Sequence, residues 1–236
     1  NCEPKFVLFL LGKTGTRKST LSALFLSFFG KFTSSDLPLS FRDTANSITH
    51  HAFTLKDVLT CIDDFHPCGK QEETKLTSTA QSIMRSYGDR TGRGRLKSDA
   101  TPMDSRPPQG NAIITAEFPP DIGESGTARY FGLELKSGDV NLSMLSILQK
   151  EASEGILQKT MYAYTKMISN FVNADEKKFV GSLAESFRIY RNEFNKQNIQ
   201  CHGRVPEIVA NLRIGMKMFL LFMKEHKVID DEACSN

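Results

Sequence analysis

A lysine and a serine stand at the spacing used by loops that bind nucleotide phosphates. An apolar run over residues 6–11 leads to Gly12, and Lys18 and Ser19 follow six and seven positions later. In the pattern G-x-x-x-x-G-K-[ST], backbone N–H groups cradle the phosphates, the lysine reaches the β- and γ-phosphates, and the hydroxyl holds Mg²⁺. Arg17 occupies the place of the second glycine. The sequence therefore predicts a phosphate-binding loop with one departure from the pattern.

The predicted loop lies between an apolar strand and an apolar helix. The strand brings the loop to the edge of a sheet, and the helix directs the positive end of its dipole at the phosphates. We expect ATP as the ligand and Mg²⁺ as its cofactor, and the alternative is a plain strand–turn–helix without a ligand. The residues predicted to contact the nucleotide are Gly12, Lys13, Thr14, Gly15, Thr16, Arg17, Lys18, Ser19 and Thr20.

A second apolar segment, residues 58–62, ends in the adjacent carboxylates Asp63 and Asp64. In an ATP-hydrolysing site, one carboxylate holds the metal through water and another orients or deprotonates the attacking water. We therefore assign Asp63 and Ser19 to the metal, and Asp64 and Lys18 to catalysis. A glutamate is usual at the second acidic position, so Asp64 is a departure. A strand that ends in an exposed acidic turn is the alternative.

A third apolar strand, residues 111–116, ends at Glu117. In phosphate-binding-loop proteins of this kind, a polar residue at the tip of the strand between the two motifs senses the γ-phosphate. We expect Thr115 or Glu117 to do so, and Glu117 joins the predicted catalytic residues.

Positive charge is concentrated in one segment. The chain has a net charge of +3, and residues 81–108 contain six basic and three acidic side chains. A local excess of arginine and lysine favours contact with nucleic-acid phosphates. The candidates are Arg90, Arg93, Arg95 and Lys97. A solvated loop is one alternative, and contact with the nucleotide of a neighbouring subunit is another.

The composition is that of a soluble globular protein, with 39% apolar and 24% charged residues. The apolar runs are far shorter than the roughly 20 residues that cross a bilayer, and no signal peptide precedes the first strand, so we expect a cytoplasmic protein without a membrane partner. Five cysteines without a C-x-x-C pair support neither a disulfide framework nor a zinc site. No metal-ligand companions stand at plausible spacing from His50, His51, His66 and His202, so we interpret these four as structural or surface residues. Because the first strand follows Asn1 almost at once, we expect a domain excised from a longer protein.

From residue 142 onward the apolar spacing changes to that of helices, over residues 142–172, 176–197 and 204–226. We therefore predict an α/β fold. Its phosphate-binding-loop core is expected over residues 1–140, followed by an all-helical lid or bundle over residues 141–236.

The order of these motifs resembles that of the AAA+ and superfamily 3 helicase branch of P-loop ATPases. Several short strings resemble more closely the ATPase domain of helicase-like proteins encoded by phages, plasmids and bacterial mobile elements. These strings lie at residues 43–47, 63–67, 93–96, 115–117 and 127–129.

The resemblance implies a mainly parallel five-stranded sheet in the order 5-1-4-3-2 with a helical lid. It implies an ATP-driven helicase or primase-helicase that assembles as a homo-oligomeric ring on single-stranded or forked DNA. It also implies that Arg129, just before the last strand at residues 130–135, enters the neighbouring subunit's site as an arginine finger. A local ion pair with a carboxylate is the alternative for Arg129.

Two further functions stay open at this point. Arg17 and Asp64 depart from the efficient pattern, which favours a switch or assembly module that hydrolyses ATP slowly. In the other alternative, the protein is a small-molecule kinase and the basic segment at residues 90–95 closes over the phosphates.

Overall fold

The computed structural model describes residues 3–92, 94, 98–101 and 104–230. The chain divides into two compact units, which are described separately. The first unit spans Lys5–Lys159, and the second begins at Thr160 and also takes in the segment that ends at Pro4. None of the helices within the described ranges is long and apolar enough to cross a membrane.

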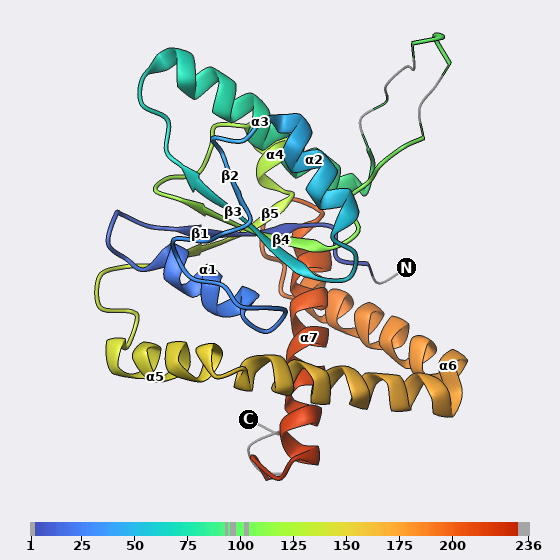
Figure 1. Ribbon diagram of the computed structural model, residues 1–236. Helices are drawn as coiled ribbons and strands as arrows, with labels where there is room; N and C mark the ends of the chain where they lie inside the picture. Colours follow the sequence, from blue (N-terminus) through green and yellow to red (C-terminus); the bar gives the residue numbers. More distant parts are fainter. Residues whose placement is uncertain (1–2, 93, 95–97, 102–103, 231–236) are drawn as a thin grey trace. The chain divides into compact units, whose positions relative to one another are not determined.

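The first unit is built on a five-stranded sheet whose strands all run parallel (Figure 1). Its spatial order is β2-β3-β4-β1-β5, which confirms the expected order. The strands are β1 Val7–Leu11, β2 Leu39–Ser40, β3 Leu59–Phe65, β4 Asn111–Ala116 and β5 Tyr130–Glu134. Because parallel strands all end at the same edge of a sheet, the residues that follow β1, β3 and β4 gather at one edge.

Helices cover both faces of this sheet. Helix α1, Lys18–Leu26, lies on one face, and α2, Ala45–Thr54, and α3, Lys70–Asp89, lie over the other (Figure 1). The main core fills the α2 and α3 side, where alternate residues of the strands, such as Phe9 and Ile114, are fully buried. Burial on both faces explains why β1 is apolar throughout and why residues 112–114 of β4 form an apolar run instead of alternating with polar residues.

Two further helices complete this unit. The short helix α4, Gly123–Thr127, precedes β5. Helix α5, Leu142–Ser153, follows it and begins at Asn141, whose side chain accepts a hydrogen bond from the backbone N–H of Met144. This bond satisfies one of the free donors of the first turn. Gly155, with a φ of 80°, separates α5 from α6, so the helix expected over residues 142–172 is two helices.

The second unit contains most of α6, Ile156–Lys196, and all of α7, Val205–Glu225. Met167, Met218 and Phe222 are buried where these helices pack together, with Phe179 and Leu183 against them. The backbone of α6 leaves the helical range at Asp175, where two of the expected helices were separated. The expected division after residue 140 differs from the compact units, because α5 belongs with the sheet.

Candidate functional site

The loop between β1 and α1, which was predicted to cradle phosphates, turns on residues with positive φ. Gly12 adopts a φ of 153°, and a Cβ added there would lie 2.4 Å from the carbonyl oxygen of Leu135, so no larger residue fits. Gly15 and Arg17 have φ values of 90° and 69°, in the left-handed region. Glycine adopts this conformation freely, whereas arginine is strained in it. Arg17, at the place of the second glycine, therefore has the left-handed backbone conformation that favours glycine.

Lys18 folds back over the loop that precedes it. Its Nζ donates hydrogen bonds to the carbonyl oxygens of Gly12, at 2.6 Å, and Lys13, at 3.1 Å. Thr16 also donates to the Lys13 carbonyl, at 2.8 Å. Among the described residues, no side chain caps the first turn of α1. The ammonium group and the N-terminus of α1 thus direct positive charge to the same place, as phosphate binding needs.

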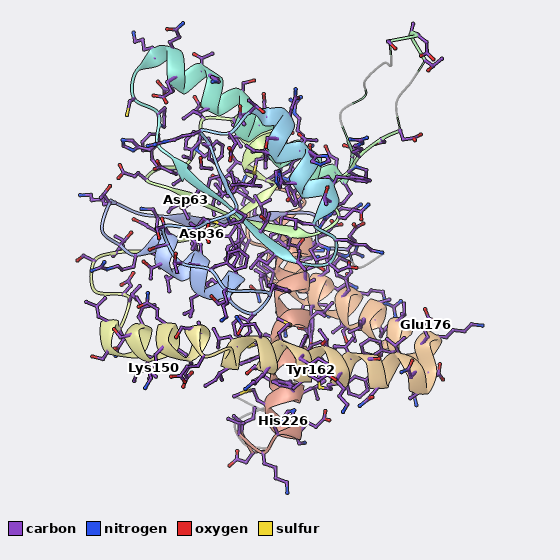
Figure 2. The ribbon with its side chains drawn as sticks, viewed as in Figure 1. Asp36, Asp63, Lys150, Tyr162, Glu176 and His226 are labelled. Carbon is purple, nitrogen blue, oxygen red and sulfur yellow. The ribbon has the colours of Figure 1, made fainter. Side chains whose placement is uncertain are left out.

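Three elements meet at the carboxylate of Asp63, labelled at the end of β3 in Figure 2. Its Oδ1 accepts a hydrogen bond from Ser19 Oγ of α1 at 2.9 Å and another from Thr115 Oγ1 of β4 at 2.6 Å. The Thr115 hydroxyl, which is buried, in turn accepts one from the backbone N–H of Asp64 at 2.9 Å. The two residues assigned to the metal, Ser19 and Asp63, therefore lie together.

Asp64 is turned away from Asp63 by an irregularity in β3. Ile62 pairs with Ile114 and Phe65 with Ala116, so β3 contains one residue more than β4 between these pairs. A bulge of this kind re-aims side chains. Asp64 has a φ of 66°, and its half-exposed carboxylate lies 3.8 Å from Nη2 of the exposed Arg42.

Glu117 contacts the phosphate-binding loop itself. Thr14 Oγ1 donates a hydrogen bond to its Oε1, and Nδ1 of His66 lies 3.2 Å from its Oε2. The hydrogen bond from Thr14 lowers the pKa of the Glu117 carboxyl, and the electrostatic effects of His66 and Lys18 lower this pKa further against the opposing effect of desolvation. Glu117 is therefore ionised at neutral pH.

A cleft of about 390 Å³ lies between the loop at residues 12–20 and the ends of β3 and β4. Residues from the loop, from α1 and from the ends of β3 and β4 form its walls. They are Thr14, Gly15, Arg17, Lys18, Ser19, Thr20, Ser34, Asp64, Thr115, Ala116 and Glu117.

Arg129 is held inside its own unit. Its guanidinium group lies 3.1 Å from the carboxylate of Asp89, donates a hydrogen bond to Ser125 Oγ at 2.7 Å, and also contacts the Ser125 carbonyl. The side chain is only 12% exposed. Its aliphatic part lies against Gly88, where a Cβ would come within 2.5 Å of it. The structure thus shows the local ion pair, which was the alternative to an arginine finger.

Arg90 is likewise engaged by its own chain. It donates hydrogen bonds to the carbonyl oxygens of Pro108 and Gly110 and to the side chain of Asn111, at distances between 2.7 and 3.2 Å. These bonds hold the segment that leads into β4. The other nucleic-acid candidates, Arg93, Arg95 and Lys97, lie outside the described residues.

Mg²⁺ suits the donors that meet at Asp63. Over the described parts of the chain, no group of three or more His, Cys, Asp or Glu residues is close enough to hold a metal ion by itself. Mg²⁺ in nucleotide sites needs fewer protein ligands, because it keeps several waters and binds the phosphates as well. One hydroxyl and one carboxylate, as Ser19 and Asp63 provide, fit that requirement.

Three contacts at this site were not expected from the sequence, and they involve His66, Arg42 and Ser34. His66 follows Asp63 by three residues, but neither its spacing nor its type indicated that it meets Glu117 from another strand. Arg42 and Ser34 come from the segments on either side of β2. Their positions depend on the path of the chain between α1 and β3, which turn residues do not specify.

No protein-family model matches this chain, and no curated protein matches it either, so the geometry of the site carries the functional argument.

Proposed function

We propose that the protein binds and hydrolyses ATP in the cleft between the loop at residues 12–20 and the ends of β3 and β4. The observation that carries this proposal is the pair of hydrogen bonds joining Ser19 and Thr115 to Asp63, because Ser19 follows Lys18 in the first turn of α1. A strand–turn–helix without a ligand needs no carboxylate and hydroxyls converging at the first turn of its helix.

In this proposal, each residue of the site has a role that follows from its position. Lys18 and the first turn of α1 bind the β- and γ-phosphates, and Ser19 and Asp63 hold Mg²⁺, which supplies charge neutralisation on the phosphate oxygens when it is bound. Thr115 fixes the Asp63 carboxylate, and its buried hydroxyl is already engaged by two hydrogen bonds. We therefore assign contact with the γ-phosphate to the hydroxyl of Thr14 instead of that of Thr115, and Glu117 contacts the attacking water.

Water activation falls to Glu117 in this proposal, in place of Asp64. An ionised carboxylate offers about four acceptor positions on its two oxygens. Thr14 and His66 occupy one on each oxygen and leave the others for water. In the reaction, the water oxygen bonds to the γ-phosphorus, its proton passes to Glu117, and the bond to the β,γ-bridging oxygen breaks to give ADP and phosphate.

The wider proposal is that hydrolysis drives movement on nucleic acid, as the resemblance to helicase-like ATPases implies. The charge excess at residues 81–108 supports it. The position of Arg129 favours the second candidate, a switch or assembly ATPase with slow turnover, because a finger that acts in a neighbour must first leave its ion pair with Asp89.

ATP turnover measured with and without single-stranded DNA tests both proposals. Lys18→Ala removes a charge-assisted contact to the phosphates, which is worth about 1.5–3 kcal/mol or roughly 10- to 100-fold in affinity. We expect it to abolish measurable turnover, and a variant that keeps wild-type turnover would refute the site. Stimulation by DNA supports the motor, whereas slow turnover that DNA leaves unchanged supports the switch.

A further inference from the structure

A second hollow of about 490 Å³ continues from the phosphate cleft along α1. Thr20 and Ser34 line both spaces, so the two meet at the first turn of the helix. The hollow then follows one face of α1, past Leu24 to Ser27, and its other walls come from the segment after α1 and from α5. The seven helical residues from Thr20 to Leu26 extend about 10 Å, a length that accommodates a nucleoside.

The far part of this hollow has an aromatic wall that the fold holds in place. Phe32 is half-buried and lines the hollow. Its ring lies against Gly30, where a Cβ would come within 2.9 Å of it, so glycine is required for the ring to take this position. The carbonyl oxygen of Gly30 accepts a hydrogen bond from the side chain of Gln158, which fixes the turn that carries the ring.

Polar side chains stand around the same space. Asp36, labelled in Figure 2, contributes a carboxylate from the segment between α1 and β2, and Gln149 contributes an amide from α5. The backbone N–H of Asp36 donates to the Thr33 carbonyl at 3.0 Å, which closes this segment into a turn. A carboxylate accepts hydrogen bonds, and an amide both donates and accepts them. The edge of adenine presents an amino donor and a ring-nitrogen acceptor, whereas uracil has a carbonyl acceptor in place of the amino group.

We propose that this hollow binds the nucleoside part of the substrate, with the base stacked on Phe32 and its polar edge toward Asp36 and Gln149. The inference rests on the proposed function, because the phosphates must occupy the adjoining cleft for the base to reach this place. It assigns purine nucleoside triphosphates as the substrate class and gives the segment at residues 31–36 the role of recognising the base.

Comparing ATP with inorganic tripolyphosphate separates the two parts of the site. Both carry three phosphates, but only ATP has a base. The dissociation constants of both, measured by calorimetry with Mg²⁺, are compared for wild type, Phe32→Leu and Asp36→Asn. Leucine keeps an apolar side chain and guards against a loss of folding. Phe29→Leu is the matched control, since Phe29 is exposed and lines neither space.

We expect Phe32→Leu to weaken ATP binding about tenfold, as the loss of one base–aromatic stack does. Tripolyphosphate binding should change less than about twofold, and Asp36→Asn should reduce the preference for ATP over UTP. Equal weakening of ATP and tripolyphosphate, or no weakening of either, overturns the nucleoside site alone. If tripolyphosphate binds wild type and Lys18→Ala equally, the phosphate site is refuted, and the proposed function with it.

Discussion

The ends of β3 and β4 both bring a carboxylate to the cleft, but they hold it in different ways. At β3, the bulge separates the adjacent acids, so that Asp63 faces Ser19 while Asp64 lies near the exposed Arg42. At β4, Glu117 is held by Thr14 of the phosphate-binding loop and by His66. In the proposed site, this difference favours Glu117, which contacts the loop, over Asp64, which only neighbours Asp63 in the sequence, as the carboxylate that acts on the attacking water.

The largest expected effect separates these two carboxylates directly. Removing a general base costs typically 10²- to 10⁴-fold in rate. We expect Glu117→Gln to lower kcat by about that factor without weakening ATP binding, and Asp64→Asn to lower it at least tenfold less. Glu73→Gln, on the exposed first turn of α3, is the control. A greater loss of kcat in Asp64→Asn than in Glu117→Gln would reverse the comparison.

The next largest effect is expected at Asp63, which accepts hydrogen bonds from Ser19 and Thr115. Asp63→Asn keeps the shape of the side chain but removes the charge next to Ser19. A residue that holds a metal through water typically contributes 10- to 100-fold to metal affinity. We expect the Mg²⁺ concentration for half-maximal turnover to rise by about this factor. An unchanged Mg²⁺ requirement would show that Asp63 is a structural acceptor for Ser19 and Thr115.

Substitution of His66 tests whether its contact with Glu117 orients that carboxylate. We expect His66→Ala to lower kcat several-fold at constant KM, because the carboxylate loses a contact that orients it. His66→Asn retains a donor and should recover part of the rate, while His50→Ala, on the exposed surface of α2, is the control. In the Glu117→Gln background, His66→Ala should have no further effect. Full additivity of the two changes would mean that His66 acts elsewhere.

Backbone strain distinguishes Asp64 and Arg17 from Glu117, and the free energy of unfolding can measure this difference. Asp64 and Arg17 both have left-handed φ values, which cost a non-glycine residue about 1–2 kcal/mol. We expect Asp64→Gly and Arg17→Gly each to raise the free energy of unfolding by about 1 kcal/mol, measured with urea. Glu117 is not among the residues with positive φ, so Glu117→Gly should lower the free energy of unfolding. A loss of stability in all three variants would contradict this explanation.

The smallest effect is on the titration of Glu117. Its pKa is lowered in the folded protein chiefly by the hydrogen bond from Thr14. The resulting stabilisation is present above the unfolded pKa of about 4.3 and is lost as the pH falls through the lower folded-state pKa. Thr14→Ala should therefore raise the pKa of Glu117 in an NMR titration of its side-chain carboxyl. A pKa that stays low would assign the shift to His66 and Lys18.

Much of the fold could be predicted because its signals are local. β1 and the middle of β4 are short apolar runs, and β3 has Thr60 as its only polar residue before its acidic end, as in strands buried on both faces. The order of the strands followed from the resemblance. Ser19 and Asp63 lie together, as expected, because the edge of a parallel sheet collects the residues that end its strands.

The remaining parts of the site depend on contacts between distant segments. The bulge that turns Asp64 away arises from the pairing of β3 with β4, and the approach of His66 to Glu117 depends on the same pairing. The burial of Arg129 against Gly88 and Asp89 depends on how α3 packs beside α4. An arginine before a strand looks the same in the sequence whether it serves a neighbour or pairs with its own chain.

The central claim is that the loop at residues 12–20 binds the phosphates of a nucleotide, and calorimetric titration of the protein with Mg²⁺ and ATP tests it most directly. Wild type should bind one ATP per chain, and Lys18→Ala should bind it at least about tenfold more weakly while unfolding at the same urea concentration. Equal binding by wild type and Lys18→Ala, or no binding by wild type, would contradict the account.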